Sequence, residues 1–170
     1  MATRIVQTNN APFTRIDVDT VTVDIIENAL RNARVEMDAV LFRTAMSPGI
    51  REQGDCFPMI ANRDGKMVVG QFGSFIHGFT QAYNAELNEG DVILTNDPYQ
   101  GGHNSHLPDW GFFRPIFHKG ELLFFTLCRG HQMDTGGSFP GGYFPNGFDI
   151  HAEGICIPPI KVHDRGRERT

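Results

Sequence analysis

The longest regular pattern of apolar positions in the chain lies between Thr20 and Met46 and has the three- and four-residue spacing of an α-helix. The pattern comprises Val23, Ile26, Ala29, Leu30, Ala33, Met37, Val40 and Leu41. Asp19 is suited to cap this helix, because its side chain can accept hydrogen bonds from the N–H groups of the first turn, and Ser47-Pro48-Gly49 predicts its end. The apolar stripe predicts packing of the helix against a core.

Beyond Gly49 the chain consists of short apolar runs separated by turn residues, a pattern that predicts β-strands. Asn62-Arg63-Asp64-Gly65 and His118-Lys119-Gly120 each predict the turn of a hairpin. The expected strands cover residues 56–61, 66–70, 92–95, 111–117 and 121–129, and a strand-like segment covers 154–162.

Two long loops rich in Gly and Pro interrupt this pattern, at residues 96–108 and 134–149, and a second helix is expected between Gly78 and Leu87. The elements together indicate an α+β fold, in which the N-terminal helix packs on a mixed, mainly antiparallel sheet. Polar side chains gather in the two loops, so we expect the loops to carry the functional groups.

Length and charge narrow the range of functions. The chain has 170 residues, enough for one core, and we expect residues 1–17 to be a flexible N-terminal arm before a single domain over 18–170. The net charge of −5, with scattered basic residues, argues against a nucleic-acid partner. The sequence shows neither a membrane-spanning apolar run nor the apolar core of a signal peptide, so we expect a cytoplasmic location. The charged end, residues 161–170, shows no closing element, and we expect that the polypeptide continues or that a partner completes it.

The first long loop contains side chains with metal-binding chemistry. His106 lies in this loop, Asp109 directly follows the loop three residues later, and His131 follows the strand expected at 121–129. Imidazole and carboxylate ligands together suit Zn, Mn or Fe, and two histidines with one carboxylate leave positions open for water or substrate. A hairpin returning beside the loop would bring the three side chains together, with Asp55 as a candidate fourth ligand.

Other polar residues keep alternative roles. His103 is an alternative ligand to His106 or an exposed loop residue, and His77 is either structural or part of a substrate pocket. Asp134 is placed to orient His131 through a hydrogen bond. The sequence contains neither a Gly-x-Ser-x-Gly nucleophile motif nor a Walker A loop, so we expect no nucleotide site in this segment.

A series of short motifs spreads over most of the chain. They are Asn96-Asp97-Pro98-Tyr99, Gly101-Gly102, His106-Leu107-Pro108-Asp109, Arg129-Gly130-His131, Asp134-Thr135-Gly136-Gly137, Pro140-Gly141-Gly142-Tyr143 and Glu153-Gly154-Ile155-Cys156-Ile157-Pro158-Pro159-Ile160-Lys161. Combined, they are similar to the signature of the hydantoinase B/oxoprolinase family, and the resemblance extends from about residue 18 to residue 163. The loop before His106 departs from the family pattern, because His103-Asn104-Ser105 stands where one small residue is common.

The resemblance implies both a site and a partner. His106, Asp109 and His131 match the family's metal ligands, and Asp55 matches an additional one. Family members open cyclic amides with ATP, and a hydantoinase A-like ATPase subunit binds the ATP and Mg²⁺. The expected function is therefore that of the metal-binding catalytic subunit in a hetero-oligomer, or of its N-terminal part, since the family's subunits are several hundred residues long. Proton transfer is assigned to two acidic residues, Asp134 and Glu153.

Three other functions remain open from the sequence. Within the family, the alternative is a subunit of an ATP-dependent ketone carboxylase of the acetone or acetophenone type. Two histidines and a carboxylate also form the facial triad of non-haem iron oxygenases, although the usual ligand spacing differs. A non-catalytic fragment, in which the metal only holds loops together, is the third alternative.

Overall fold

The computed structural model of the chain describes residues 18–71, 76–102, 105–142 and 144–170. The expected N-terminal arm, residues 1–17, and His103 therefore lie outside the described residues. Within them, one seven-stranded sheet has the order β2-β1-β5-β4-β3-β6-β7, and each strand pairing is antiparallel. The elements are α1 Thr20–Thr44, α2 Pro48–Arg51, β1 Met59–Asn62, β2 Met67–Val69, α3 Ile76–Ala82, β3 Val92–Thr95, the π-helical turn η1 Pro98–Gly102, β4 Asp109–His118, β5 Glu121–His131, the 3₁₀-helix η2 Ile150–Glu153, β6 Ile160–Asp164 and β7 Arg167–Glu168. The predicted α+β fold is confirmed.

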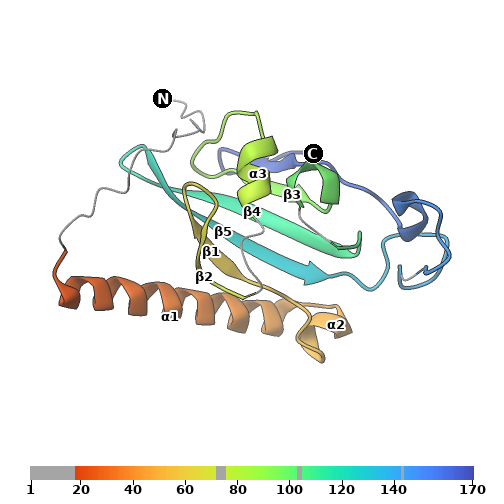
Figure 1. Cartoon of the computed structure of the whole chain (residues 1–170), viewed down its shortest axis with the longest axis horizontal. Helices are drawn as coiled ribbons and strands as arrows, with labels where there is room; N and C mark the ends of the chain where they lie inside the picture. Colours follow the sequence, from red (N-terminus) through yellow and green to blue (C-terminus); the bar gives the residue numbers. More distant parts are fainter. Residues whose placement is uncertain (1–17, 72–75, 103–104, 143) are drawn as a thin grey trace.

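The β4–β5 hairpin forms the centre of the sheet and is its longest strand pair (Figure 1). Its turn residues Lys119 and Gly120 have φ angles of 50° and 82°, as a two-residue turn of type I′ requires. The register changes once, because Ile116 pairs with Phe124 whereas Phe117 pairs with Leu122. One extra residue on β5 thus forms a β-bulge, and every pair beyond it is displaced by one position.

Helix α3 covers the core side of this hairpin through one aromatic residue. The Phe79 ring stacks on Phe113 of β4 with ring centroids 4.6 Å apart, and it meets the edge of Phe125 of β5 at 6.1 Å. All three side chains have no exposed surface. Aromatic contacts of this kind contribute roughly 0.5–1.5 kcal/mol beyond the burial of their area, so Phe79 anchors α3 to the sheet.

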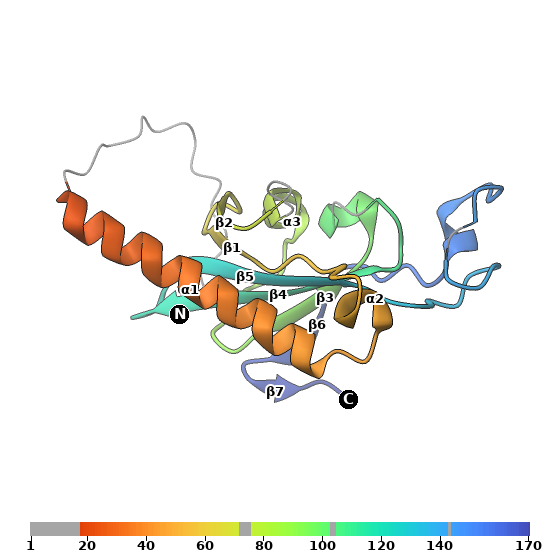
Figure 2. The ribbon, with the colours of Figure 1, turned by 90° about the horizontal axis from the view of Figure 1, so that it is seen from below.

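Helix α1 has the predicted position but not the predicted burial. It spans Thr20–Thr44, and the Asp19 side chain accepts a hydrogen bond from the Thr22 N–H at 2.9 Å, which confirms the predicted cap. However, α1 contains no buried residue, so the prediction that its apolar stripe is core packing is wrong. The helix lies beside the β1–β2 edge of the sheet rather than beneath the core (Figures 1 and 2). The half-buried side of α1 also carries charged residues, because Arg34 and Asp38 form an ion pair there at 3.1 Å.

Three other expectations differ from the structure. Helix α3 begins at Ile76 and ends at Ala82, earlier than the expected range between Gly78 and Leu87, because Ile76 and Phe79 together supply its buried face. The strand-like segment 154–162 joins the sheet only from Ile160 onward. The expected open end, residues 161–170, folds as the β6–β7 hairpin.

The buried Asp91 carboxylate holds this last hairpin in place. It accepts hydrogen bonds from the backbone N–H of Arg165 at 2.8 Å and of Asn88 at 2.7 Å, and it pairs with the Lys161 ammonium at 2.8 Å. The carboxylate of Asp91, directly before β3, therefore binds both the turn and the first strand of the β6–β7 hairpin. None of the described helices combines the length and apolar character needed to cross a membrane.

Candidate metal centre

The register of the β4–β5 hairpin places Asp109 and His131 directly opposite each other. Asp109 is the first residue of β4 and His131 is the last residue of β5. Opposite residues on antiparallel strands project to the same face, with Cβ atoms roughly 5 Å apart, so the backbone ladder itself brings the two side chains together. The bulge is essential to this pairing, because the register near the turn, extended without it, would place Gly130 opposite Asp109.

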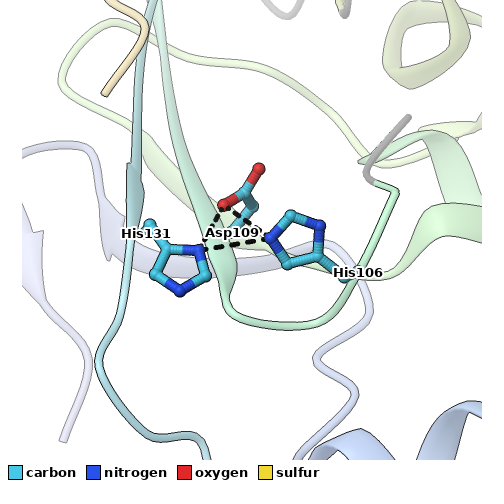
Figure 3. A group of neighbouring side chains, drawn as sticks. All are labelled: His106, Asp109 and His131. Atoms are coloured by element: carbon cyan, nitrogen blue, oxygen red, sulfur yellow. Dashed lines mark hydrogen bonds and ion pairs between the residues drawn. The ribbon is translucent and has the colours of Figure 1, made fainter. Parts of the chain in front are cut away.

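His106 reaches the same point from the loop between η1 and β4. Its Nε2 atom is 3.2 Å from Nδ1 of His131 and 3.3 Å from Oδ1 of Asp109. The third distance, from His131 Nδ1 to Asp109 Oδ1, is 3.2 Å (Figure 3). Three potential ligand atoms from a loop and two strands thus form a nearly equilateral triangle.

The dimensions of this triangle fit a metal ion. Ligand atoms bound about 2.1 Å from one ion lie roughly 3.0–3.4 Å from each other, from octahedral to tetrahedral geometry. All three observed separations fall in that range. Two imidazoles and a carboxylate suit Zn, Mn or Fe, and three ligands leave further coordination positions open. His106, Asp109 and His131 are therefore a candidate metal-binding triad.

The charges at the triad favour a cation. The hydrogen bond to the Asp109 carboxylate raises the pKa of His106, against the opposing effect of desolvation. Burial by itself raises the pKa of Asp109, but the hydrogen bond and the charge of His106 outweigh it and lower the pKa overall. Asp109 is thus held as a carboxylate in a buried position, where its negative charge stabilises an imidazolium or a metal ion.

Ser105 orients the His106 ring. Its Oγ is 2.7 Å from His106 Nδ1, on the side of the ring away from the triad. A proton on Nδ1 would donate to the Ser105 hydroxyl and leave the Nε2 lone pair directed at Asp109 and His131. This is the usual arrangement by which a second hydrogen bond fixes the tautomer of a metal-binding histidine.

Asp55 lies next to the triad at His131. Its Oδ2 is 3.7 Å from His131 Nδ1, and its backbone oxygen accepts a hydrogen bond from the His131 N–H at 3.1 Å. On the other side, Ser47 Oγ donates to the His131 carbonyl at 3.1 Å. Asp55, in the segment between α2 and β1, and Ser47, directly before α2, therefore both secure the end of β5. The role of Asp55 as a fourth ligand stays a prediction.

The remaining residues selected from the sequence differ in their distance from the triad. Glu153 is beside it, because its Oε2 accepts a hydrogen bond from the Leu107 N–H at 3.2 Å. Asp134 is exposed, and its described hydrogen bond is from the Gly136 N–H at 2.8 Å within its own loop. His77 is exposed on α3, with Nδ1 3.3 Å from the Asp64 carbonyl and Nε2 3.0 Å from the Gln81 amide. The proton-transfer roles of Asp134 and Glu153 and the pocket role of His77 stay predictions.

Three residues around the triad were not selected from the sequence. Asn96 and Ser105 lie within the motif-bearing loop, and Arg129 is two residues before His131. Arg129 is only 2% exposed, and burial lowers its pKa to about 10, although the negative charge of Asp109 opposes that shift. For Asn96 and Arg129 the available signal was a polar residue directly after or within a buried strand, which is costly unless it is paired.

A family model described as hydantoinase B/oxoprolinase matches residues 19–170. Among characterised relatives, the caprolactamase subunit beta of Pseudomonas jessenii is 37% identical over 161 residues, covering 89% of this chain and 27% of the relative. The 5-oxoprolinase 1 of Arabidopsis thaliana is 34% identical over 157 residues, covering 87% of this chain and 12% of the relative. The chain thus spans about a quarter or less of the length of these relatives.

A solved structure shows the same fold. The crystal structure of the ATP-dependent caprolactamase from Pseudomonas jessenii superposes with a TM-score of 0.73 at 32% identity, over 91% of this chain and 28% of that one. The sequence match and the structural match both include nearly all of the described residues. This chain therefore belongs to the hydantoinase B/oxoprolinase family.

Proposed function

We propose that this chain is the metal-binding part of a catalytic subunit in an ATP-dependent cyclic amide hydrolase. The supporting observation is the triad itself: three potential ligand atoms separated by 3.2–3.3 Å, in a chain whose relatives include a caprolactamase subunit and a 5-oxoprolinase. The proposed substrate class is a lactam, an oxoproline or a hydantoin. These rings share an amide bond whose carbonyl carbon is a poor electrophile.

The proposed partner is a hydantoinase A-like ATPase subunit, which binds ATP and Mg²⁺. Transfer of the γ-phosphoryl group to the amide oxygen would make the ring carbon electrophilic. Water would then attack that carbon, and the ring C–N bond would break with release of phosphate. The name of the caprolactamase relative, subunit beta, supports a division of the reaction between polypeptides.

In this division, His106, Asp109 and His131 would hold one Zn, Mn or Fe ion, with Asp55 as an additional ligand. Such an ion, when bound, supplies Lewis-acid polarisation of a carbonyl or phosphoryl oxygen. The neighbouring side chains of this chain would hold the metal-binding residues in place, and one acidic side chain would accept a proton. Glu153 is the better placed of the two predicted acceptors, because it already contacts the peptide next to His106 whereas Asp134 closes a turn.

The first test is metal content. His131→Ala removes one corner of the triad, so we expect the purified variant to lose nearly all bound metal, measured by elemental analysis and by titration with Mn²⁺ and Zn²⁺. His118→Ala is the matched control, because His118 is exposed at the opposite end of the same hairpin. Full metal occupancy in His131→Ala would overturn the assignment.

The second test is turnover with a co-expressed hydantoinase A-like subunit. We expect ATP hydrolysis to depend on a cyclic amide, with ring opening followed by chromatography for caprolactam, 5-oxoproline and hydantoin. A ketone with bicarbonate is included in parallel. Turnover of the ketone alone would replace the hydrolase with a carboxylase, and bound metal without turnover of either class would leave a structural role.

A further inference from the structure

Leu107, the residue that follows His106, is held through both of its backbone polar groups by side chains. Leu107 is fully buried, and its N–H donates to Glu153 Oε2 at 3.2 Å. Its carbonyl accepts a hydrogen bond from Asn96 Nδ2 at 2.7 Å. Both polar groups of the residue next to a metal-ligand candidate are thus fixed by residues distant in the sequence.

Asn96 joins this peptide to two other parts of the chain. It directly follows β3 and is fully buried. Its Nδ2 also donates to the Ile155 carbonyl at 2.8 Å, and its Oδ1 accepts from the Ile157 N–H at 2.6 Å. One amide therefore connects the end of β3, the loop that carries His106, and the segment that follows Glu153.

His106 needs such an anchor more than the other two members of the triad do. Asp109 and His131 are set by the β4–β5 ladder, whereas His106 lies in the loop before β4 and takes no part in that ladder. A ligand on a loop is placed less accurately than one on a strand unless its neighbours are fixed, and displacements near 1 Å are enough to impair a site. The two bonds to Leu107 supply this constraint.

We propose that Asn96 is a positioning residue for the metal centre, because its bond to the Leu107 carbonyl holds His106 against Asp109 and His131. Glu153 holds the same residue, Leu107, through its N–H group. This inference rests on the proposed metal-binding function. It assigns to Asn96 an effect on metal affinity beyond its effect on folding.

The test uses the whole chain and Co²⁺ alone, since the visible absorption of Co²⁺ reports both its affinity and its coordination geometry. Asn96→Asp keeps the shape and the acceptor for Ile157 but turns an oxygen toward the carbonyls of Leu107 and Ile155. We expect Co²⁺ affinity to fall about 10- to 100-fold, the usual effect of losing a group that orients a ligand. The absorption spectrum at saturation should also change.

Thr95→Val is the matched control for folding. Thr95 is buried next to Asn96, and its hydroxyl donates to the Ile157 carbonyl at 2.9 Å and accepts from the Asp97 N–H at 3.2 Å. The substitution removes buried hydrogen bonds from the same segment without touching Leu107. We expect a lower melting temperature but less than about a threefold change in Co²⁺ affinity, with an unchanged spectrum. An equal loss of affinity in both variants would reduce Asn96 to a folding residue and overturn the proposal.

A second pair of variants keeps the proposal testable if Asn96→Asp does not fold. Glu153→Gln retains an acceptor for the Leu107 N–H but loses the charge, and Glu153→Ala loses both. We expect Glu153→Gln to bind Co²⁺ within about threefold of the parent chain and Glu153→Ala to bind it at least about tenfold more weakly. Equal affinity of the two variants would contradict the proposal that the bonds to Leu107 position His106.

The results distinguish this inference from the proposed function. If the parent chain itself binds no Co²⁺ and no other divalent ion, the metal centre is wrong and the inference is wrong with it. If the parent chain binds Co²⁺ and His131→Ala does not, the metal centre holds. Unchanged affinity in Asn96→Asp would then overturn only the positioning role.

Discussion

The candidate metal centre and helix α1 depart in opposite ways from the usual distribution of buried apolar and exposed polar side chains. Around the centre and along β3, polar side chains are buried, namely Asp91, Thr95, Asn96, Asp97, Asp109, Arg129, His131 and Thr135. On α1, apolar side chains are exposed, with Ile25 at 64% and Val35 at 60%. Apolar residues usually lie inside a protein and polar residues outside. Buried polar groups and exposed apolar surface are therefore the observations that carry information about a region.

The difference shows where buried side-chain hydrogen bonds are concentrated in this chain. Buried polar groups are stable only when they are paired, and those near the centre are tied to backbone atoms of neighbouring segments or to each other. Such a network fixes positions accurately, which a constellation of metal ligands requires. The buried polar region is therefore where small changes should have the largest consequences.

Helix α1 shows the reverse. Its residues at Leu30, Arg34, Met37 and Leu41 are half-buried, and the rest of its apolar stripe is exposed. A groove of about 830 Å³ runs between α1 and β2, lined by Val23, Ile26, Leu30 and residues 67–70 among others. In this chain, α1 gains little from burial, so single substitutions on it should be mild.

The largest stability effect that sharpens this comparison is expected at Asp91. Asp91→Asn leaves the half-buried Lys161 ammonium without its charged partner and weakens the hydrogen bonds to Arg165 and Asn88. We expect a loss of about 3 kcal/mol in the free energy of unfolding at pH 7, measured by urea denaturation. Lys161 also lies 3.6 Å from Asp164, so Asp164→Asn is the exposed control and should cost much less.

The Asp91 effect should depend on pH in one direction. Burial by itself raises the pKa of Asp91, but the hydrogen bonds from Lys161, Arg165 and Asn88 outweigh it and lower the pKa below its ordinary value of 3.8. A lowered pKa in the folded state stabilises the protein above the unfolded-state pKa, and that stabilisation is lost as the pH falls through the folded-state pKa. The difference between parent and Asp91→Asn should therefore be constant from pH 7 to about 5 and shrink below about pH 4. A difference that grows in acid would contradict the ion pair.

An intermediate effect is expected on the half-buried side of α1. Leu30→Ala removes methyl groups that line the groove toward β2. We expect a loss of about 1 kcal/mol, below the roughly 2–5 kcal/mol of fully buried leucines, because the side chain is only partly removed from water. Urea denaturation measures it, and a loss above about 2 kcal/mol would mean that α1 is packed more tightly than its exposure indicates.

The smallest effect is expected on the exposed side of the same helix. Ile25→Ala shortens a side chain that is 64% exposed, so the stability of the chain should change by less than about 0.5 kcal/mol. Alanine also has the higher helix propensity, which offsets part of any loss. If Ile25→Ala cost as much as Leu30→Ala, the difference between the two sides of α1 would disappear.

Much of the fold was predictable because its signals are local. The α1 helix with its Asp19 cap, the hairpin turn at Lys119-Gly120 and the strand 92–95 each depend on neighbouring residues and are confirmed. The burial of α1 was wrong because helical spacing shows which side of a helix is apolar but does not show what covers it. The β6–β7 hairpin was missed because its partner, Asp91, is 70 residues earlier in the chain than Lys161.

The residues of the candidate site could be predicted from the sequence, but the strand register that brings them together could not. The sequence determined the chemical set, two imidazoles and a carboxylate beside glycine-rich turns, and it determined the family through motifs spread over most of the chain. The register of the hairpin was not determined, because residues 122–125 are Leu-Leu-Phe-Phe and show no alternation of apolar and polar positions.

Only the tertiary structure decided that register. Near the turn, the buried residue of β5 is Leu122, at an even-numbered position. From Phe125 to His131 every odd-numbered residue is buried, and the bulge at Leu123 lies where the buried face changes. The core requires the ring of Phe125 and the side chain of Leu127 to point inward, and a shift of one residue would turn every side chain of the strand to the other face. By satisfying the core in this way, the bulge also brings His131 opposite Asp109, so packing far from the candidate metal centre determines the geometry of its residues.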